Sequence, residues 1–294
     1  MNSRTPVQKS IDIDHMHIGI HQWGTPAEEK PTVVLLHATG FHGRVWDKVC
    51  DQLHDFPIIA IDLRGHGSSD SNDFSSWRDF GEDVAATLRK LQLKHVVLVG
   101  HSLGAVAAAV AAHIEPVIIE KVLMMDPVIL PPMVYQHNMI DMSPAEKATR
   151  ARQAEFESIE AMINRYSARE PFQRFQKDVF EDYCRHGLVW QDDKQCYTLA
   201  CSPEFEAKVY NYAGKFGEIF ETLEQLEQRV HVLRAMPPPD MKRFYGFAFS
   251  PTYAELVKHL KNGKDIVLSE HSHFIPQQDP ATAAEHIKAL IDEQ

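Results

Sequence analysis

Short, continuous apolar runs alternate with helical patterns through the first half of the chain, and this alternation constrains the fold more than any other feature. The runs lie within residues 31–40, 56–61, 96–99 and 122–125. A few apolar residues bounded by turn-forming residues are typical of a strand that is buried on both faces. Such strands occur in parallel sheets that helices cover on both sides. The sequence therefore predicts an α/β fold with a mostly parallel, twisted sheet and helices on both faces.

The pattern of strands and helices extends to both ends of the chain. Residues 11–23 predict an antiparallel strand pair, and residues 77–91 predict a helix that covers the sheet. Strand patterns return within residues 229–240 and 264–276, and residues 280–291 predict a last amphipathic helix.

The stretch from about residue 131 to residue 228 has a different pattern. Strand signals vanish there, and helix starts follow one another, with proline at positions 144, 171 and 203. A connection of roughly a hundred residues is much longer than an ordinary loop in such a sheet. We therefore expect a core domain formed by residues 1–130 and 229–294, with a helical cap of residues 131–228 inserted between late strands.

The pentad Gly100-His101-Ser102-Leu103-Gly104 stands where an apolar strand pattern gives way to a helical one. A serine at a tight strand-to-helix turn exposes its hydroxyl, and the close approach of the two segments requires glycine on either side. The following helix directs free N–H groups toward negative charge that forms beside that oxygen. Chance alone produces such a pentad in about one protein of this length in ten, so the surrounding residues must decide its meaning.

A nucleophilic serine needs a base and an acid that orients the base. In a parallel sheet these groups stand at the carboxyl ends of strands. His273 follows the strand pattern near residues 266–268 and is the expected base. Two acids fit the chain order Ser, Asp, His: Asp126 at the tip of a strand, and Asp240 behind three prolines. A strand tip fixes a carboxylate better than a proline-rich loop does, which favours Asp126.

The oxyanion formed by attack on a carbonyl needs two backbone donors. The N–H of Leu103, directly after the serine, is one, and the N–H of Thr39 in the HATGF loop is the best candidate for the other. We interpret His37 as a structural residue that pins this loop. Asp62, Arg64 and His66 form a structural turn under the site in this interpretation.

Four segments carry a resemblance to a known family: LLHATGFHGRVWD, IAIDLRGHGSSD, GHSLG and HFIPQQDP. Their order and spacing resemble those of the α/β-hydrolase family over nearly the whole chain, and the stretch 131–228 resembles that family's cap domain. The resemblance implies nucleophile Ser102, base His273, and oxyanion donors at Thr39 and Leu103. The segment RAMPPPDMKRF lacks the family's usual glycine-then-aspartate arrangement, which again favours Asp126 over Asp240.

These residues predict a serine hydrolase that cleaves a carboxylic ester through an acyl-enzyme intermediate, in the manner of a carboxylesterase or lipase. A thioesterase, a lactonase, a C–C bond hydrolase or an acyltransferase would use the same triad, and a non-catalytic ligand-binding member of the fold is a further alternative. Epoxide hydrolases and haloalkane dehalogenases need a carboxylate nucleophile, so a serine argues against them. Five cap residues are candidates for an apolar pocket wall: Met133, Tyr135, Phe172, Trp190 and Tyr197.

Composition narrows the choice of partner. The net charge of -11 argues against nucleic acid and anionic membranes as partners, and no apolar run is long enough to span a membrane. We expect a small, apolar acyl ester as substrate. The four cysteines and 17 histidines show no metal-ligand spacing or disulfide framework, so no metal or cofactor is expected. With no secretion signal, these features favour a cytoplasmic location.

Overall fold

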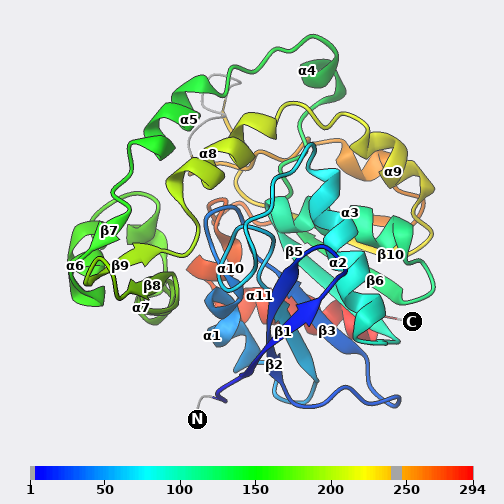
Figure 1. The fold of residues 1–294 in the computed structure, drawn as a ribbon. Helices are drawn as coiled ribbons and strands as arrows, with labels where there is room; N and C mark the ends of the chain where they lie inside the picture. Colours follow the sequence, from blue (N-terminus) through cyan, green and yellow to red (C-terminus); the bar gives the residue numbers. More distant parts are fainter. Residues whose placement is uncertain (1–3, 240–246, 294) are drawn as a thin grey trace.

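An eight-stranded sheet forms the centre of the protein (Figure 1). The computed structural model describes residues 4–239 and 247–293. The order of the strands in the sheet is β1-β2-β4-β3-β5-β6-β10-β11. Their bounds are β1 Val7–Asp12, β2 His17–Trp23, β3 Thr32–Leu36, β4 Ile58–Ile61, β5 Val96–His101, β6 Ile119–Met125, β10 Arg229–Arg234 and β11 Gly263–Val267.

The direction of the strands confirms the predicted mostly parallel sheet. β2 is antiparallel to both of its neighbours, β1 and β4. The remaining pairs, from β4 across to β11, are all parallel. The antiparallel pair expected at residues 11–23 is thus β1 and β2, although β1 begins earlier than the sequence pattern indicates.

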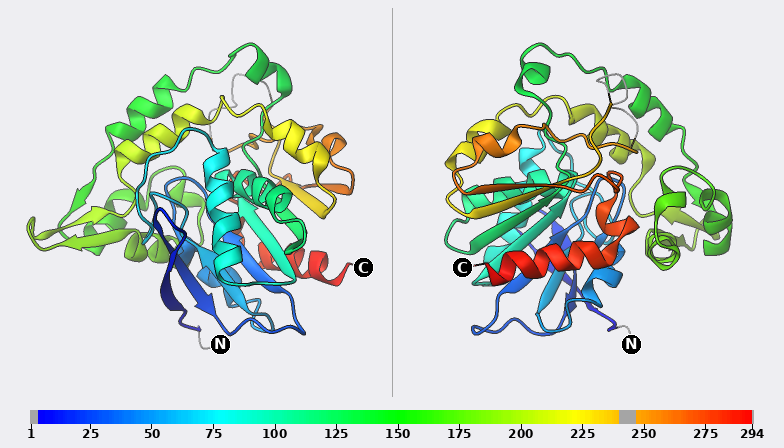
Figure 2. Two further views of the ribbon diagram at one scale, coloured as in Figure 1. Left: turned by 45° about the vertical axis from the view of Figure 1, so that its right-hand side comes forward. Right: turned by 180° about the vertical axis from the view of Figure 1, so that it is seen from behind.

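Successive residues of the central strands enter two different hydrophobic cores. In β5, Val96 and Leu98 pack with one core, whereas Val97 and Val99 pack with the other. Side chains alternate between the faces of a strand, so a strand buried on both faces must be apolar throughout, which explains the continuous runs in the sequence. Figure 2 shows the two covering layers, with α2 (Arg78–Lys90) and α3 (Leu103–Ile114) on one face and α11 (Pro280–Asp292) on the other.

The chain between β6 and β10 lies above the carboxyl ends of the strands (Figure 1). We refer to residues 131–228 as the inserted segment. Its helices are α4 Pro132–Gln136, α5 Ser143–Arg150, α6 Ile159–Tyr166, α7 Lys177–His186, α8 Pro203–Tyr212 and α9 Ile219–Gln225. Two short core helices complete the set: α1 Asp47–Cys50 and α10 Ile275–Gln278.

The inserted segment is not entirely helical, contrary to the expectation from its sequence. It also contains an antiparallel sheet of three short strands in the order β7-β9-β8: Glu155–Phe156, Cys196–Leu199 and Leu188–Gln191. Each strand buries one of its residues, so none has the long apolar run by which the core strands are recognised. Among the described residues, no helix is long and apolar enough to cross a membrane.

Candidate active site

Ser102 stands at the sharp turn between β5 and α3. Its φ and ψ are 58° and −118°, a strained conformation for a residue other than glycine. A Cβ atom at Gly100 would lie 2.2 Å from the carbonyl oxygen of Gly104. A Cβ atom at Gly104 would lie 2.5 Å from the carbonyl oxygen of Leu36. Both glycines of the pentad are therefore required by the close approach of neighbouring backbone.

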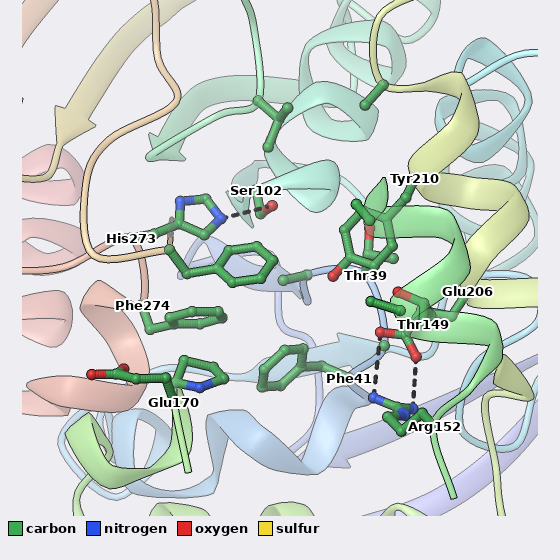
Figure 3. A pocket seen from close by; sticks show the side chains of 18 of the residues that line it. Thr39, Phe41, Ser102, Thr149, Arg152, Glu170, Glu206, Tyr210, His273 and Phe274 are labelled. Carbon is green, nitrogen blue, oxygen red and sulfur yellow. Dashed lines mark hydrogen bonds and ion pairs between the residues drawn. The ribbon is translucent and has the colours of Figure 1, made fainter. Parts of the chain in front are cut away.

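His273 brings its imidazole to Ser102 from the far end of the chain (Figure 3). Its Nε2 lies 3.1 Å from Ser102 Oγ, and its Nδ1 lies 2.7 Å from Asp126 Oδ2. Ser102, His273 and Asp126 are 6%, 2% and 0% exposed. Because a carboxylate only accepts hydrogen bonds, Nδ1 carries the proton and Nε2 is free to accept one from the serine hydroxyl. The structure thus brings together three residues from distant parts of the sequence.

Asp126 is held at the tip of β6 by groups from three other segments. Its Oδ1 accepts hydrogen bonds from the Ala235 N–H at 2.9 Å and the Ser250 hydroxyl at 2.5 Å. The Thr252 hydroxyl donates to the same oxygen at 3.2 Å. Together with His273, these donors fix the orientation of both carboxylate oxygens.

The sheet itself fixes the placement of the serine relative to the acid. His101 and Met125 are register partners on the adjacent strands β5 and β6, and Ser102 and Asp126 are the residues that follow them. The alternative acid, Asp240, lies outside the described residues. Among the described residues, Asp126 is the candidate acid that lies against His273.

Three further residues hold the site together and were not predicted from the sequence. His101 Nε2 donates to the carbonyl oxygen of His273 at 2.8 Å, and burial lowers the pKa of His101 far below its usual value, so the ring is neutral. The position of His101 inside the pentad was a signal that could have found it. Ser250 and Thr252 carried no such signal, because they lie more than a hundred residues from Asp126 in the chain.

The two predicted oxyanion donors lie beside Ser102. Thr39 and Ser102 both line the same cavity, and Leu103 is the first residue of α3. Neither N–H group donates to another backbone oxygen in the part of the chain that the structure describes. Unpaired N–H groups at a helix N-terminus and in an adjacent loop are the donors that an oxyanion requires.

Two buried histidines pin the loop that carries Thr39. The N–H of Leu63 donates to His37 Nε2 at 2.9 Å, and the N–H of Gly40 donates to His66 Nε2 at 2.9 Å. Burial lowers the pKa of His37 to about 3 and that of His66 to about 4. Both rings are therefore neutral and accept hydrogen bonds. We call this pair the histidine clamp.

The neighbouring turn is also held by structural contacts. Asp62 accepts hydrogen bonds from the N–H of Gly43 at 2.6 Å and the N–H of Ser68 at 2.9 Å. Arg64 forms a two-pronged ion pair with Asp83 on α2, with N–O distances of 2.5 and 2.6 Å. These contacts fit the interpretation of Asp62, Arg64 and His66 as a structural turn.

A cavity of about 580 Å³ opens over Ser102 and is walled by both the core and the inserted segment. Its apolar wall includes Phe41 and Phe274 from the core and Phe172 from the inserted segment. Of the five wall residues expected from the sequence, only Phe172 lines it. The expectation was wrong for Met133, Tyr135, Trp190 and Tyr197. Met133 and Trp190 are exposed, and the Tyr135 hydroxyl accepts a hydrogen bond from the Leu130 N–H at 3.0 Å.

A sequence model of the Alpha/beta hydrolase family matches residues 33–286. The chain belongs to this family. Esterase Rv0045c of Mycobacterium tuberculosis is 24% identical over 289 residues, which cover 92% of this chain and 85% of that protein. 2-(Acetamidomethylene)succinate hydrolase of Mesorhizobium japonicum is 30% identical over 122 residues, which cover 41% of this chain and 42% of the relative's length.

Solved structures confirm the α/β-hydrolase fold over almost the whole chain. The crystal structure of E-2-(acetamidomethylene)succinate hydrolase has a TM-score of 0.77 at 22% identity and covers 98% of this chain and 100% of that chain. The structure of the M. tuberculosis esterase Rv0045c has a TM-score of 0.74 at 21% identity, and the match covers 100% of this chain and 94% of that chain. At these identities the similarity shows the fold alone.

One side of the cavity in this α/β hydrolase is polar. Arg152 pairs with the buried Glu206, with a distance of 2.6 Å between Nη2 and Oε2 (Figure 3). The Glu206 carboxylate lies against the Thr39 loop, because a Cβ atom at Gly40 would come within 2.5 Å of Glu206 Oε1. Burial raises the pKa of Glu206, and the Arg152 charge opposes that rise.

One cluster of described residues has a spacing suited to a metal ion, and it lies away from Ser102. It consists of Asp47, Asp182 and His186. Arg44 already binds Asp47 through two nitrogens, at 2.9 and 2.6 Å, and Lys48 Nζ lies 3.0 Å from Asp182. These cations neutralise the carboxylates, so the donor set does not fit a divalent cation.

Proposed function

We propose that this α/β hydrolase is a serine hydrolase that cleaves a carboxylic ester through an acyl-enzyme intermediate. One observation carries the proposal: Ser102, His273 and Asp126 form a continuous hydrogen-bonded chain, with distances of 3.1 and 2.7 Å, at the wall of a cavity. A neutral imidazole between a hydroxyl and a carboxylate is the arrangement that activates a serine.

In the proposed reaction, Ser102 Oγ attacks the ester carbonyl while His273 Nε2 takes the hydroxyl proton. The carbonyl oxygen becomes an alkoxide held by the N–H groups of Thr39 and Leu103. The imidazolium returns its proton to the leaving alcohol as the C–O bond breaks, which leaves Ser102 acylated. A water molecule then attacks the acyl group, gives its proton to His273, and releases the acid as the serine is restored. Asp126 orients His273 and stabilises its positive charge throughout.

The inserted segment acts as a cap in this proposal, with the core formed by residues 1–130 and 229–294. The cap supplies Phe172 and the core supplies Phe41 and Phe274 to one apolar wall, which suits an apolar part of a small acyl ester. The relatives support this reading in part, since one of them is named an esterase and another is named a hydrolase of a succinate derivative.

The test is replacement of the nucleophile. The Ser102→Ala variant should lose hydrolysis of p-nitrophenyl butyrate by about 10³-fold or more and should lose labelling by a fluorophosphonate probe. Thermal unfolding should stay nearly unchanged, because one hydroxyl is removed. Ser269→Ala, an exposed serine on the loop after β11, is the matched control and should keep full activity. Retained turnover in Ser102→Ala would refute the assignment.

The related activities use the same triad and differ in the bond that is cleaved or in the acceptor. A panel of oxygen esters, thioesters, lactones and C–C bonded β-diketones, each offered with and without an alcohol acceptor, distinguishes an esterase from the thioesterase, lactonase, C–C hydrolase and acyltransferase alternatives. Folded wild-type protein that no fluorophosphonate labels would instead favour a ligand-binding protein without catalysis.

A further inference from the structure

Three arginines and a tyrosine from the inserted segment lie on the polar side of the cavity. They are Arg152, Arg165, Tyr166 and Arg169, and all four line the cavity that contains Ser102. We call them the arginine cluster. The positive charges of the three arginines oppose the rise that burial causes in the pKa of the Tyr166 hydroxyl.

Two buried donors of the arginine cluster have no acceptor within residues 4–239 and 247–293. Arg152 uses its two Nη atoms on Glu206, whereas its buried Nε has no hydrogen-bond partner among the described residues. Tyr166 is 5% exposed, and its buried hydroxyl donates to no acceptor there. Buried donors are nearly always paired in native proteins. Two orphaned donors on the wall of one cavity therefore point to an acceptor that a ligand supplies.

The charges of this side of the cavity are not balanced. The two glutamates that line it are both occupied: Glu206 pairs with Arg152, and Glu170 pairs with Arg174 at 2.8 Å. Arg165 and Arg169 have no carboxylate within 4.0 Å in the part of the chain that the structure describes. Arg165 and Arg169 are exposed, and their unpaired positive charge favours an anion at this cavity although the protein carries a net charge of -11.

The arginine cluster lies close enough to Ser102 to act on the same small molecule. Glu206 pairs with Arg152 on one side. On the other side it lies against Gly40, where an added Cβ atom would come within 2.5 Å of Glu206 Oε1. Gly40 follows Thr39, the proposed oxyanion donor. Figure 3 shows Arg152 and Glu206 on the same side of the pocket as Thr39. The Glu206 side chain therefore lies between Arg152 and the loop that carries the proposed oxyanion donor.

We propose that the substrate is an ester that also carries a free carboxylate, such as the half-ester of a short dicarboxylic acid, and that the arginine cluster binds this carboxylate. The inference rests on the proposed function and names the substrate class of that site. Arg152 Nε and the Tyr166 hydroxyl offer one donor to each carboxylate oxygen, and Arg165 and Arg169 attract the anion to the mouth of the cavity. The apolar wall then holds the alcohol part.

The test compares monomethyl glutarate with dimethyl glutarate, which differ by one charge. Wild-type protein should show the higher kcat/KM for the half-ester, and added salt should lower that value while leaving the diester unaffected. The double variant Arg152→Met/Glu206→Gln removes the guanidinium without leaving a bare buried carboxylate. Its kcat/KM for the half-ester should fall by about 10- to 100-fold, and this loss should exceed the loss for the diester. Arg185→Met, an arginine of α7 that does not line the cavity, is the control for charge.

A wild-type preference for the diester, or an equal loss on both esters in the double variant, would overturn the proposal. Calorimetric titration of monomethyl glutarate into Ser102→Ala protein, with and without the double substitution, tests the anion site when no ester is hydrolysed. Binding that the double substitution abolishes supports the anion site even if the proposed ester hydrolysis fails. No binding, or tighter binding of inorganic phosphate than of the half-ester, overturns it.

Discussion

Asp126 accepts hydrogen bonds from one backbone N–H and two hydroxyls in addition to its contact with His273. At the scale of the residue, this surrounding explains why the carboxylate can orient an imidazole. A carboxylate that rotates freely would accept hydrogen bonds from water instead, and it would not fix the histidine tautomer. The three donors to Oδ1 leave Oδ2 directed at His273 Nδ1.

Substitution of this acid should separate catalysis from stability. In Asp126→Asn the side chain can present its NH₂ group to His273, which favours the tautomer whose Nε2 cannot accept the serine proton. We expect kcat to fall by about 10³- to 10⁴-fold, with thermal unfolding only modestly affected. Steady-state kinetics with p-nitrophenyl butyrate measure this. Asp240→Asn is the companion variant and should keep activity within a small factor. Similar mild effects from both variants would contradict the placement of the acid.

Residue identity was predictable where chain geometry alone restricts the choice. Ser102 lies between two glycines at a strand-to-helix turn, and His273 follows a strand near the last helix, so pattern and position sufficed. Ser250 and Thr252 donate to Asp126 from a loop 124 and 126 residues away. Such long-range hydroxyl contacts leave no periodicity in a single sequence.

At the scale of the element, the histidine clamp couples the Thr39 loop to the loop after β4. Each ring must stay neutral. A protonated Nε2 has no lone pair, so it could not accept the hydrogen bond from the N–H of Leu63 or Gly40. The two loops therefore hold their relative position only while His37 and His66 remain deprotonated.

The clamp predicts that the protein loses stability in acid. The pKa values of His37 and His66 are about 3 and about 4 in the folded state, against about 6.5 for an unfolded histidine. As pH falls below about 6.5 the unfolded chain takes up protons that the folded chain does not, so the free energy of unfolding decreases by about 1.4 kcal/mol per pH unit for each ring. The stabilisation is complete above pH 6.5 and is lost toward pH 4.

Urea unfolding measured between pH 7 and pH 4 checks this expectation. His66→Gln keeps an acceptor for the Gly40 N–H and removes the titrating group. The slope of its free energy of unfolding against pH should therefore correspond to the uptake of about one proton fewer. His54 is an exposed histidine of the core domain, so the free energy of unfolding of His54→Gln should keep the wild-type dependence on pH. Equal slopes for His66→Gln and wild type would show that His66 is not buried in its neutral form.

Elements of the core were predictable because both of their faces are buried, and their apolar runs are therefore continuous. The strands β7, β8 and β9 escaped prediction because they are short and partly exposed. Their residues include Val189, Trp190 and Tyr197, which favour strands. Four polar residues between β8 and β9, positions 192–195, were the turn signal that could have identified the hairpin.

At the scale of the whole molecule, aromatic side chains join the inserted segment to the core. Phe175 contacts Phe41 and Phe274 of the core, with ring centroids 6.0 and 5.2 Å apart, and Phe172 of its own segment at 5.5 Å. Phe41, Phe172 and Phe274 line the cavity, whereas Phe175 stands behind them. The shape of the apolar wall therefore depends on a residue that the substrate does not touch.

Removal of Phe175 should widen the cavity and weaken substrate binding. Phe175→Ala deletes a buried ring and should lower the free energy of unfolding by about 3–5 kcal/mol. The loosened wall should raise KM for an apolar ester several-fold and leave kcat close to wild type. Phe216→Ala removes a buried ring that does not line the cavity and belongs to the other hydrophobic core, and it should cost stability without raising KM. An unchanged KM in Phe175→Ala would contradict this role.

Contacts between the inserted segment and the core were the least predictable from sequence. Four of the five expected wall residues do not line the cavity, because membership of an aromatic-rich segment does not determine which face of a helix or strand meets the core. The cytoplasmic location stays a prediction.

The register between β5 and β6 has a consequence for how the protein responds to heat. The hydroxyl and the carboxylate follow paired residues of two hydrogen-bonded strands at the centre of the sheet, whereas the imidazole is carried by a loop after the edge strand β11. Warming should displace that loop while the central ladder is still intact, so turnover would stop at a temperature below the melting point. A covalent link that anchors this loop to α11 would raise the working temperature without any change to the sheet.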